Sequence, residues 1–94
     1  MRIGLLVLEV YVHGAVSLKE KRRVMRSLTD RCRQKLNVSV AEVDNHDKHQ
    51  RGTLAFAAVA TSEIGVGKIL DAVVELADSI APGSIAEIER DILG

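Results

Sequence analysis

The fold of this chain is decided by two adjacent segments, IGLLVLEVYV at residues 3–12 and SLKEKRR at residues 17–23. The first segment is almost continuously apolar and has no helical spacing, which is typical of a central strand. The second begins with a capping box, in which the Ser17 hydroxyl accepts from the backbone of Glu20 and the Glu20 carboxylate reaches back to the Ser17 backbone N–H. We therefore expect a helix to begin at Leu18, shortly after the strand.

This helix is expected to extend to about Leu36, because Asn37 marks its exit. Its buried face is predicted by residues that fall within about 80° of one another at 100° per residue: Leu18, Met25, Leu28, Cys32 and Leu36. Cys32 is the one cysteine of the chain, so it forms no internal disulfide, which fits a reducing cytosol. Its place on the apolar face favours a packed core thiol over a reactive one.

Three further strands are predicted at residues 38–44, 53–61 and 85–93. The wholly polar segment at residues 45–50 is expected to be a loop. The many alanines of the strand at 53–61 indicate that a helix packs close against it. The strand at 85–93 alternates and is expected to be half exposed, with Ile88, Arg90 and Ile92 on one side and Glu87, Glu89 and Asp91 on the other.

A second helix is predicted between the last two strands. Thr61 and Ser62 offer caps for its start, and Pro82 and Gly83 stop it. Apolar residues at three- and four-residue spacing predict its buried face: Val66, Ile69, Leu70, Val73, Leu76, Ala77 and Ile80.

The resulting order is βαββαβ, whose commonest solution is the ferredoxin-like α+β sandwich. This fold places two helices on one face of a four-stranded antiparallel sheet. We expect a single ferredoxin-like domain over residues 1–94. The opposite face of the sheet has no cover, so it must be polar or meet a partner.

The composition fits one cytoplasmic domain without a membrane partner. Apolar residues make up 47% of the chain and charged residues 28%, which argues against disorder. The longest apolar run, at residues 54–60, is far shorter than the ~18 residues that span a bilayer. Glu9 interrupts the apolar start of the chain and no cleavage site follows, so a buried strand is favoured over a signal peptide.

The 13 basic and 13 acidic residues cancel, but the neutral sum conceals a charge dipole. Residues 19–35 contain eight basic and two acidic side chains, a net charge of +6, whereas residues 63–94 contain seven acidic and two basic ones, a net charge of −5. Five cations share an arc of about 100° opposite the buried face of the first helix, where their mutual repulsion favours an anionic ligand.

Phosphate groups suit such an arc, because arginine presents forked donors to their oxygens. The predicted nucleic-acid-binding residues on it are Lys19, Arg22, Arg23, Arg26 and Arg33, helped by Lys21 and Arg51. The alternative is a solvated helix face that the protein's own acidic half partly neutralises.

The scarcity of aromatic residues limits the kind of nucleic acid. Single-strand readers of this fold stack bases on aromatic side chains of the sheet. Here only Tyr11 and Phe56 are available, and no aromatic RNP-type motif is present. Backbone contact with structured RNA is therefore favoured over sequence-specific recognition of single strands.

The loop contains a second candidate site. Four residues within six positions have side chains that bind zinc or nickel in other proteins: Asp44, His46, Asp47 and His49. Only His13 is available elsewhere in the chain as a further histidine, so a polar hairpin loop is the favoured interpretation. We expect no cofactor and no catalytic residue.

The segments SLKEKRR (17–23) and NVSVAEVD (37–44), followed by Asp47 and the pair Gln50-Arg51, resemble the YlxP-like family of small bacterial proteins of unknown function. The resemblance covers nearly the whole chain. It implies a ferredoxin-like fold and gene neighbourhoods shared with translation-initiation and ribosome-maturation factors, and it brings no catalytic residues. One departure is His49, where the resemblance implies an aromatic residue, usually tryptophan.

The sequence thus predicts a non-enzymatic, ribosome-associated accessory protein that contacts ribosomal or other structured RNA through its first helix. Two alternatives stay open. One is a homo-oligomeric interaction module, such as a homodimer, that uses the open sheet face or an edge strand. The other is a metal or small-ligand binder that uses the loop at residues 44–49.

Overall fold

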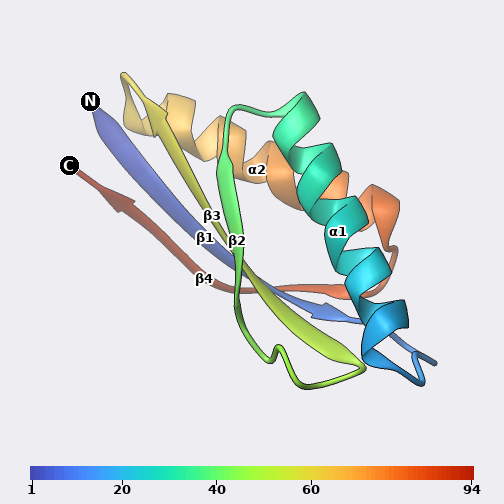
Figure 1. The fold of residues 1–94 in the computed structure, drawn as a ribbon. Coiled ribbons are helices and arrows are strands. Elements are labelled where there is room, and N and C mark those ends of the chain that lie inside the picture. The colour runs from blue at the N-terminus through green and yellow to red at the C-terminus, as the bar shows by residue number, and fades with distance from the viewer.

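The computed structural model describes all residues from 1 to 94 and confirms the predicted order of elements. In chain order these are β1 (Arg2–Tyr11), α1 (Leu18–Lys35), β2 (Ser39–Asp44), β3 (Arg51–Ala60), α2 (Glu63–Ile80) and β4 (Ile85–Leu93). The strands form one antiparallel sheet in the order β2-β3-β1-β4, and both helices lie on the same face of it (Figure 1). The fold is therefore ferredoxin-like, as the periodicity predicts.

Both helices begin at a serine cap. In α1 the Ser17 hydroxyl accepts from the Glu20 backbone N–H at 3.2 Å. The Glu20 carboxylate accepts from the backbone N–H of Val16 at 2.8 Å, one residue earlier than the predicted capping box. In α2 the cap is Ser62, whose hydroxyl accepts from the Gly65 backbone N–H at 3.0 Å. These bonds satisfy N–H groups that a helix start leaves without partners.

The core lies between the helices and the covered face of the sheet. The central strand β1 contributes its even-numbered residues from Gly4 to Val10, which alternate inward, as a strand's period of two requires. The buried apolar cluster consists of Leu6, Leu8, Val10, Met25, Leu28, Cys32, Val40, Leu54, Phe56, Ala58, Val66, Leu70, Val73 and Ala77. Leu18 and Leu36, predicted for the buried face of α1, are only half buried at its two ends.

A β-bulge corrects the predicted alternation of β4. Val7 pairs with Glu89 but the next residue, Leu8, pairs with Glu87, so Ile88 is an extra residue that leaves the register. As a result Glu87 lies on the helix side of the sheet with Arg90, not with the other two acids. Ile88 is half exposed.

Helices pack against β3, as its alanines predict, but these alanines are divided between the two faces of the sheet. Ala58 is buried under the helices, but Ala55 and Ala57 point to the open face. The open face also carries Leu5 and Val7 of β1 and the half-exposed Val59 of β3. The sequence predicts that the open face is polar or meets a partner. Its centre is apolar, so it does not fit the first of these expectations.

Neither helix is long and apolar enough to cross a membrane.

The close packing of α2 on β1 gives a test of the fold. A Cβ atom at Gly4 would overlap Cγ1 of Val66 and lie 3.1 Å from Cδ1 of Leu70. We expect Gly4→Ala to lower the free energy of unfolding by about 1–3 kcal/mol, because the core must shift to admit a methyl group. Gly67 is the matched control, since nothing lies within 4 Å of its added Cβ. Gly67→Ala should raise stability by about 1 kcal/mol through helix propensity. Urea denaturation measures both, and shifts of the same sign would contradict this packing.

Candidate nucleic-acid interface

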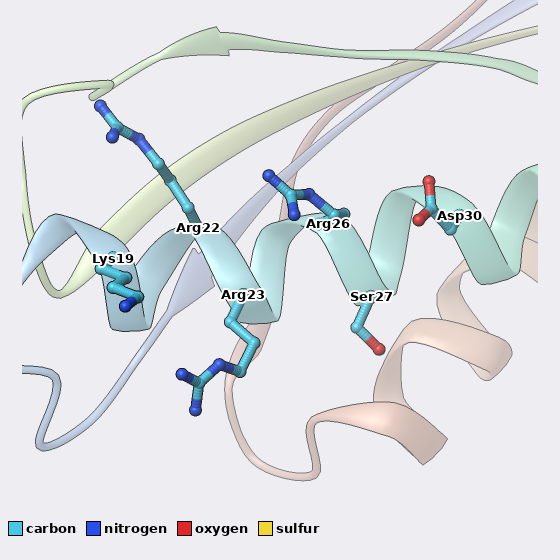
Figure 2. Close-up of a pocket in the computed structure, with 6 residues that line it drawn as sticks. All are labelled: Lys19, Arg22, Arg23, Arg26, Ser27 and Asp30. Carbon is cyan, nitrogen blue, oxygen red and sulfur yellow. The ribbon is translucent and has the colours of Figure 1, made fainter.

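The exposed face of α1 carries the predicted cationic arc. Six side chains surround a shallow hollow on this face, and none of them is apolar: Lys19, Arg22, Arg23, Arg26, Ser27 and Asp30. In Figure 2 Arg22 and Arg23 extend to opposite sides of the helix axis, with Arg26 one turn further along. The arc is therefore a broad cationic surface and not a single point of charge.

The cations of this hollow have no ionic partner within the protein. The structure contains four ion pairs, and none of them involves Lys19, Arg22, Arg23 or Arg26. All four side chains are exposed. Asp30 is the one acid in the lining and does not pair with them. The hollow thus presents positive charge that is available to an anion from outside.

Arg33 extends the arc toward the edge of the sheet. Its guanidinium Nη2 donates to the carbonyl oxygen of Val40 in β2 at 2.8 Å. Together with Arg22 and Arg26 it lines a groove between α1 and β2. At about 1.5 Å of rise per residue, the arc from Lys19 to Arg33 is roughly 21 Å long, which is enough to contact several phosphates.

Lys21 does not belong to this surface, and the prediction that it helps to bind phosphates is wrong. Its side chain is 1% exposed, and its ammonium lies 2.7 Å from the carbonyl oxygen of Asn45 and 2.9 Å from Oε2 of Glu42. The pair joins the first turns of α1 to the end of β2. A lysine with two such partners satisfies the rule that a buried charge is paired.

The Lys21–Glu42 pair is a feature that the sequence analysis missed, although a signal for it was present. On a helical wheel Lys21 falls in the centre of the apolar stripe that contains Met25, Leu28 and Cys32, roughly 200° from Lys19. A cation in that position must be buried or must disrupt the stripe. Its partner is not predictable in the same way, because Glu42 reaches it only through the pairing of β2 with β3.

Loss of the buried ammonium should destabilise the fold. We expect Lys21→Ala to lower the free energy of unfolding by about 3 kcal/mol, because the Glu42 carboxylate and the Asn45 carbonyl lose their partner. The double variant Lys21→Met/Glu42→Gln should recover part of this loss, since it leaves no isolated charge. Lys35→Ala, at an exposed position of the same helix, is the control and should change stability by less than about 0.5 kcal/mol. Equal urea midpoints for Lys21→Ala and this control would refute the role of the pair.

Arg51 is also separated from the arc. It lies on the open face of the sheet, where its Nε contacts the Glu9 carboxylate at 2.9 Å. The Glu9 side chain is only 14% exposed, so this pair is shielded from solvent on one side. Arg51 therefore acts within the sheet, and the structure does not bring it to the face of α1.

The loop at residues 44–49 does not gather its ligand-type side chains. Nε2 of His46 lies 3.1 Å from the carbonyl oxygen of Glu42, and Oδ1 of Asp44 accepts from the backbone N–H of Asn45 at 2.7 Å. Asn45 itself has a φ of 62° and donates to the Thr53 hydroxyl at 2.8 Å. No three histidine, cysteine, aspartate or glutamate side chains of the protein are grouped as a metal site would require.

The acidic half of the charge dipole lies at the other edge of the sheet. Arg90 of β4 contacts Asp71 of α2 at 2.7 Å and Glu87 at 2.9 Å. The hydrogen bonds that the Arg90 guanidinium donates, first to Glu87 and then to Asp71, raise its pKa. β2, which α1 contacts, and the acidic β4 are the two edge strands, so β3 and β1 lie between them.

Cys32 is fully buried in the core, as its place on the apolar stripe predicts. Burial raises the pKa of its thiol, so less of it is present as the reactive thiolate at neutral pH. The structure thus gives this side chain a packing role.

Residues 3–90 match the family model described as "Protein of unknown function (DUF503)". The chain belongs to the DUF503 family. It is also 38% identical over 90 residues to "Uncharacterized protein YlxP" from Bacillus subtilis (strain 168), in an alignment that covers 96% of this chain and 92% of that protein. The family resemblance of SLKEKRR and NVSVAEVD is thereby confirmed. Neither description names an activity.

Proposed function

We propose that this protein is a non-enzymatic accessory factor that contacts ribosomal or other structured RNA through the exposed face of α1. The observation that carries the proposal is the set of four exposed cations without an ionic partner in the protein: Lys19, Arg22, Arg23 and Arg26. Arginine binds phosphate oxygens through two parallel N–H donors, which gives such a surface both affinity and orientation. The proposal requires no reaction and no cofactor.

The aromatic residues support backbone contact over base stacking. Phe56 is 1% exposed and packs in the core, so it is not available to a base. Tyr11 is 39% exposed at the end of β1, where its ring stacks on that of His13. The sheet therefore lacks the row of aromatic side chains on which single-stranded RNA is stacked in other proteins of this shape. Phosphates of a folded RNA are the partner that α1 fits best.

The separation of charge supports the same partner. Asp71 of α2 and Glu87 of β4 pair with Arg90, and β4 is the edge strand farthest from β2, so these acids do not pair with the arc. A neutral protein with such a dipole still produces a local positive potential that attracts and orients a polyanion. The association would take place in the cytoplasm, where ribosomes are found.

Reversal of charge on the arc should abolish RNA binding. We expect Arg22→Glu/Arg23→Glu/Arg26→Glu to remain folded, because these side chains are exposed, and to lose its retention on purified bacterial ribosomes. With four phosphate contacts, the affinity of the unmodified protein should fall by roughly 50- to 150-fold between 50 and 200 mM salt. Sedimentation with ribosomes and fluorescence titration of an RNA hairpin measure these changes.

The matched control reverses three other exposed cations that lie outside the arc, in the variant Arg2→Glu/Arg31→Glu/Lys35→Glu. It changes the net charge by the same amount and should keep most of the affinity. If the control loses as much binding as the arc variant, the binding depends on total charge and the assigned site is wrong. Full ribosome retention by the arc variant overturns the proposal.

A further inference from the structure

The open face of the sheet has a raised half and a hollow half. On β1, Leu5 and Val7 project from it, and their register partners on β3 are the smaller Ala57 and Ala55. A hollow of about 240 Å³ extends from Leu5 over β3 and β2. Its lining combines Ser39, Ala41, Ala55 and Ala57 of this face with Val40 and Phe56. Large apolar side chains thus lie directly beside a depression of similar chemistry.

We propose that this face binds the same face of a second copy, about a two-fold axis that runs along the strands between β1 and β3. Such an axis exchanges β1 with β3 and β2 with β4, and it keeps each residue at its height along the strands. Leu5 of one protomer then lies over Ala57 of its partner, and Val7 lies over Ala55. Packed sheets turn by about 30° relative to each other, so this match is closest near the axis.

The charges of the edge strands select this axis over the alternative. Glu89 and Asp91 of β4 are register partners of Val7 and Leu5, so they stand at the same heights as the apolar centre. In the proposed dimer they lie over β2 of the partner, apart from the partner's own Glu89 and Asp91. An axis across the strands would instead place β4 on β4 and bring four carboxylates together, which is destabilising.

The same charges exclude anionic occupants of this face. Arg51 is the one basic side chain among the strand residues that point to it, and Arg51 is paired with Glu9. Glu89, Asp91 and Asp44 add negative charge around the apolar centre. RNA and anionic lipid would be repelled by these carboxylates, whereas a second copy supplies an apolar centre that matches the apolar centre of this face.

The size of the face is adequate for a dimer. Four strands of six to ten residues, at about 4.8 Å spacing and about 3.3 Å rise per residue, give a flat area of roughly 550 Å² on each copy, to which the projecting side chains add. Specific interfaces bury about 600–1,000 Å² per partner. Because the helices lie on the other side of each sheet, the dimer would present two cationic arcs on opposite outer surfaces.

The first test is the mass in solution. Light scattering should give twice the 10.2 kDa of one chain, and Ala57→Glu should return the protein to the mass of a monomer. Ala57 is exposed, so the variant should keep its circular dichroism, and Ala41→Glu on β2 provides an independent second variant. Ser79→Glu on the exposed face of α2 is the control and should stay dimeric. A wild-type protein that is monomeric even at about 1 mM, or an Ala57→Glu variant that dimerises like wild type, would overturn the proposal.

The second test is the orientation of the two copies. Chains with Leu5→Cys are mixed with chains with Ala57→Cys and treated with a short bis-maleimide reagent, while Cys32 stays protected in the core. The proposed axis predicts that cross-links join unlike chains most efficiently. Cross-links mainly between two Leu5→Cys chains would refute this axis. Ala57→Glu should keep its RNA affinity per chain, and the arc variant should remain dimeric, so failure of one proposal is distinguishable from failure of the other.

Discussion

The contact of the Lys21 ammonium with Glu42 and the Asn45 carbonyl fixes how α1 lies on the sheet. It joins the beginning of the helix to the end of β2 and to the loop that leads into β3. Because successive residues of a helix are turned by about 100°, an inward Lys21 forces Lys19 and Arg23, two positions away on either side, to point outward. A single buried cation thereby separates the structural charge of the helix from the charges that are free to meet a ligand.

The order of the strands then determines where the charges of the whole molecule lie. The chain is neutral, with a basic first helix and an acidic last third, and a linear sequence does not say how far apart these two parts are. The order β2-β3-β1-β4 puts the strand under α1 at one edge and the acidic strand β4 at the other. The acids of β4 are thereby separated from the strand under α1, and none of the ion pairs of the protein involves the arc.

The two proposed surfaces lie on opposite sides of the molecule, one on the exposed face of α1 and the other on the open face of the sheet. The helix layer supplies cations that a polyanion can contact. The uncovered sheet supplies an apolar face with acidic residues around it, and this face disfavours a polyanion. This division follows from the one-sided architecture of the fold, in which a four-stranded sheet must leave half of its side chains outside the core. In a small protein an apolar face of this kind is a marker of interaction with another protein surface.

The sequence by itself determined the six elements, their approximate ends, the serine caps and the family, because these depend on local periodicity and on short motifs. It also placed Lys19, Arg22, Arg23, Arg26 and Arg33 on one exposed arc, since a helical wheel needs no tertiary information. Only the tertiary structure decided that Lys21 is buried against Glu42 and that Arg51 forms an ion pair with Glu9. It also decided that Ala55 and Ala57 point to the open face of the sheet. It also decided the bulge at Ile88, which moves Glu87 to the helix side. Each of these depends on which residues stand opposite one another in neighbouring strands, and that register is set by packing between segments that are distant in the chain.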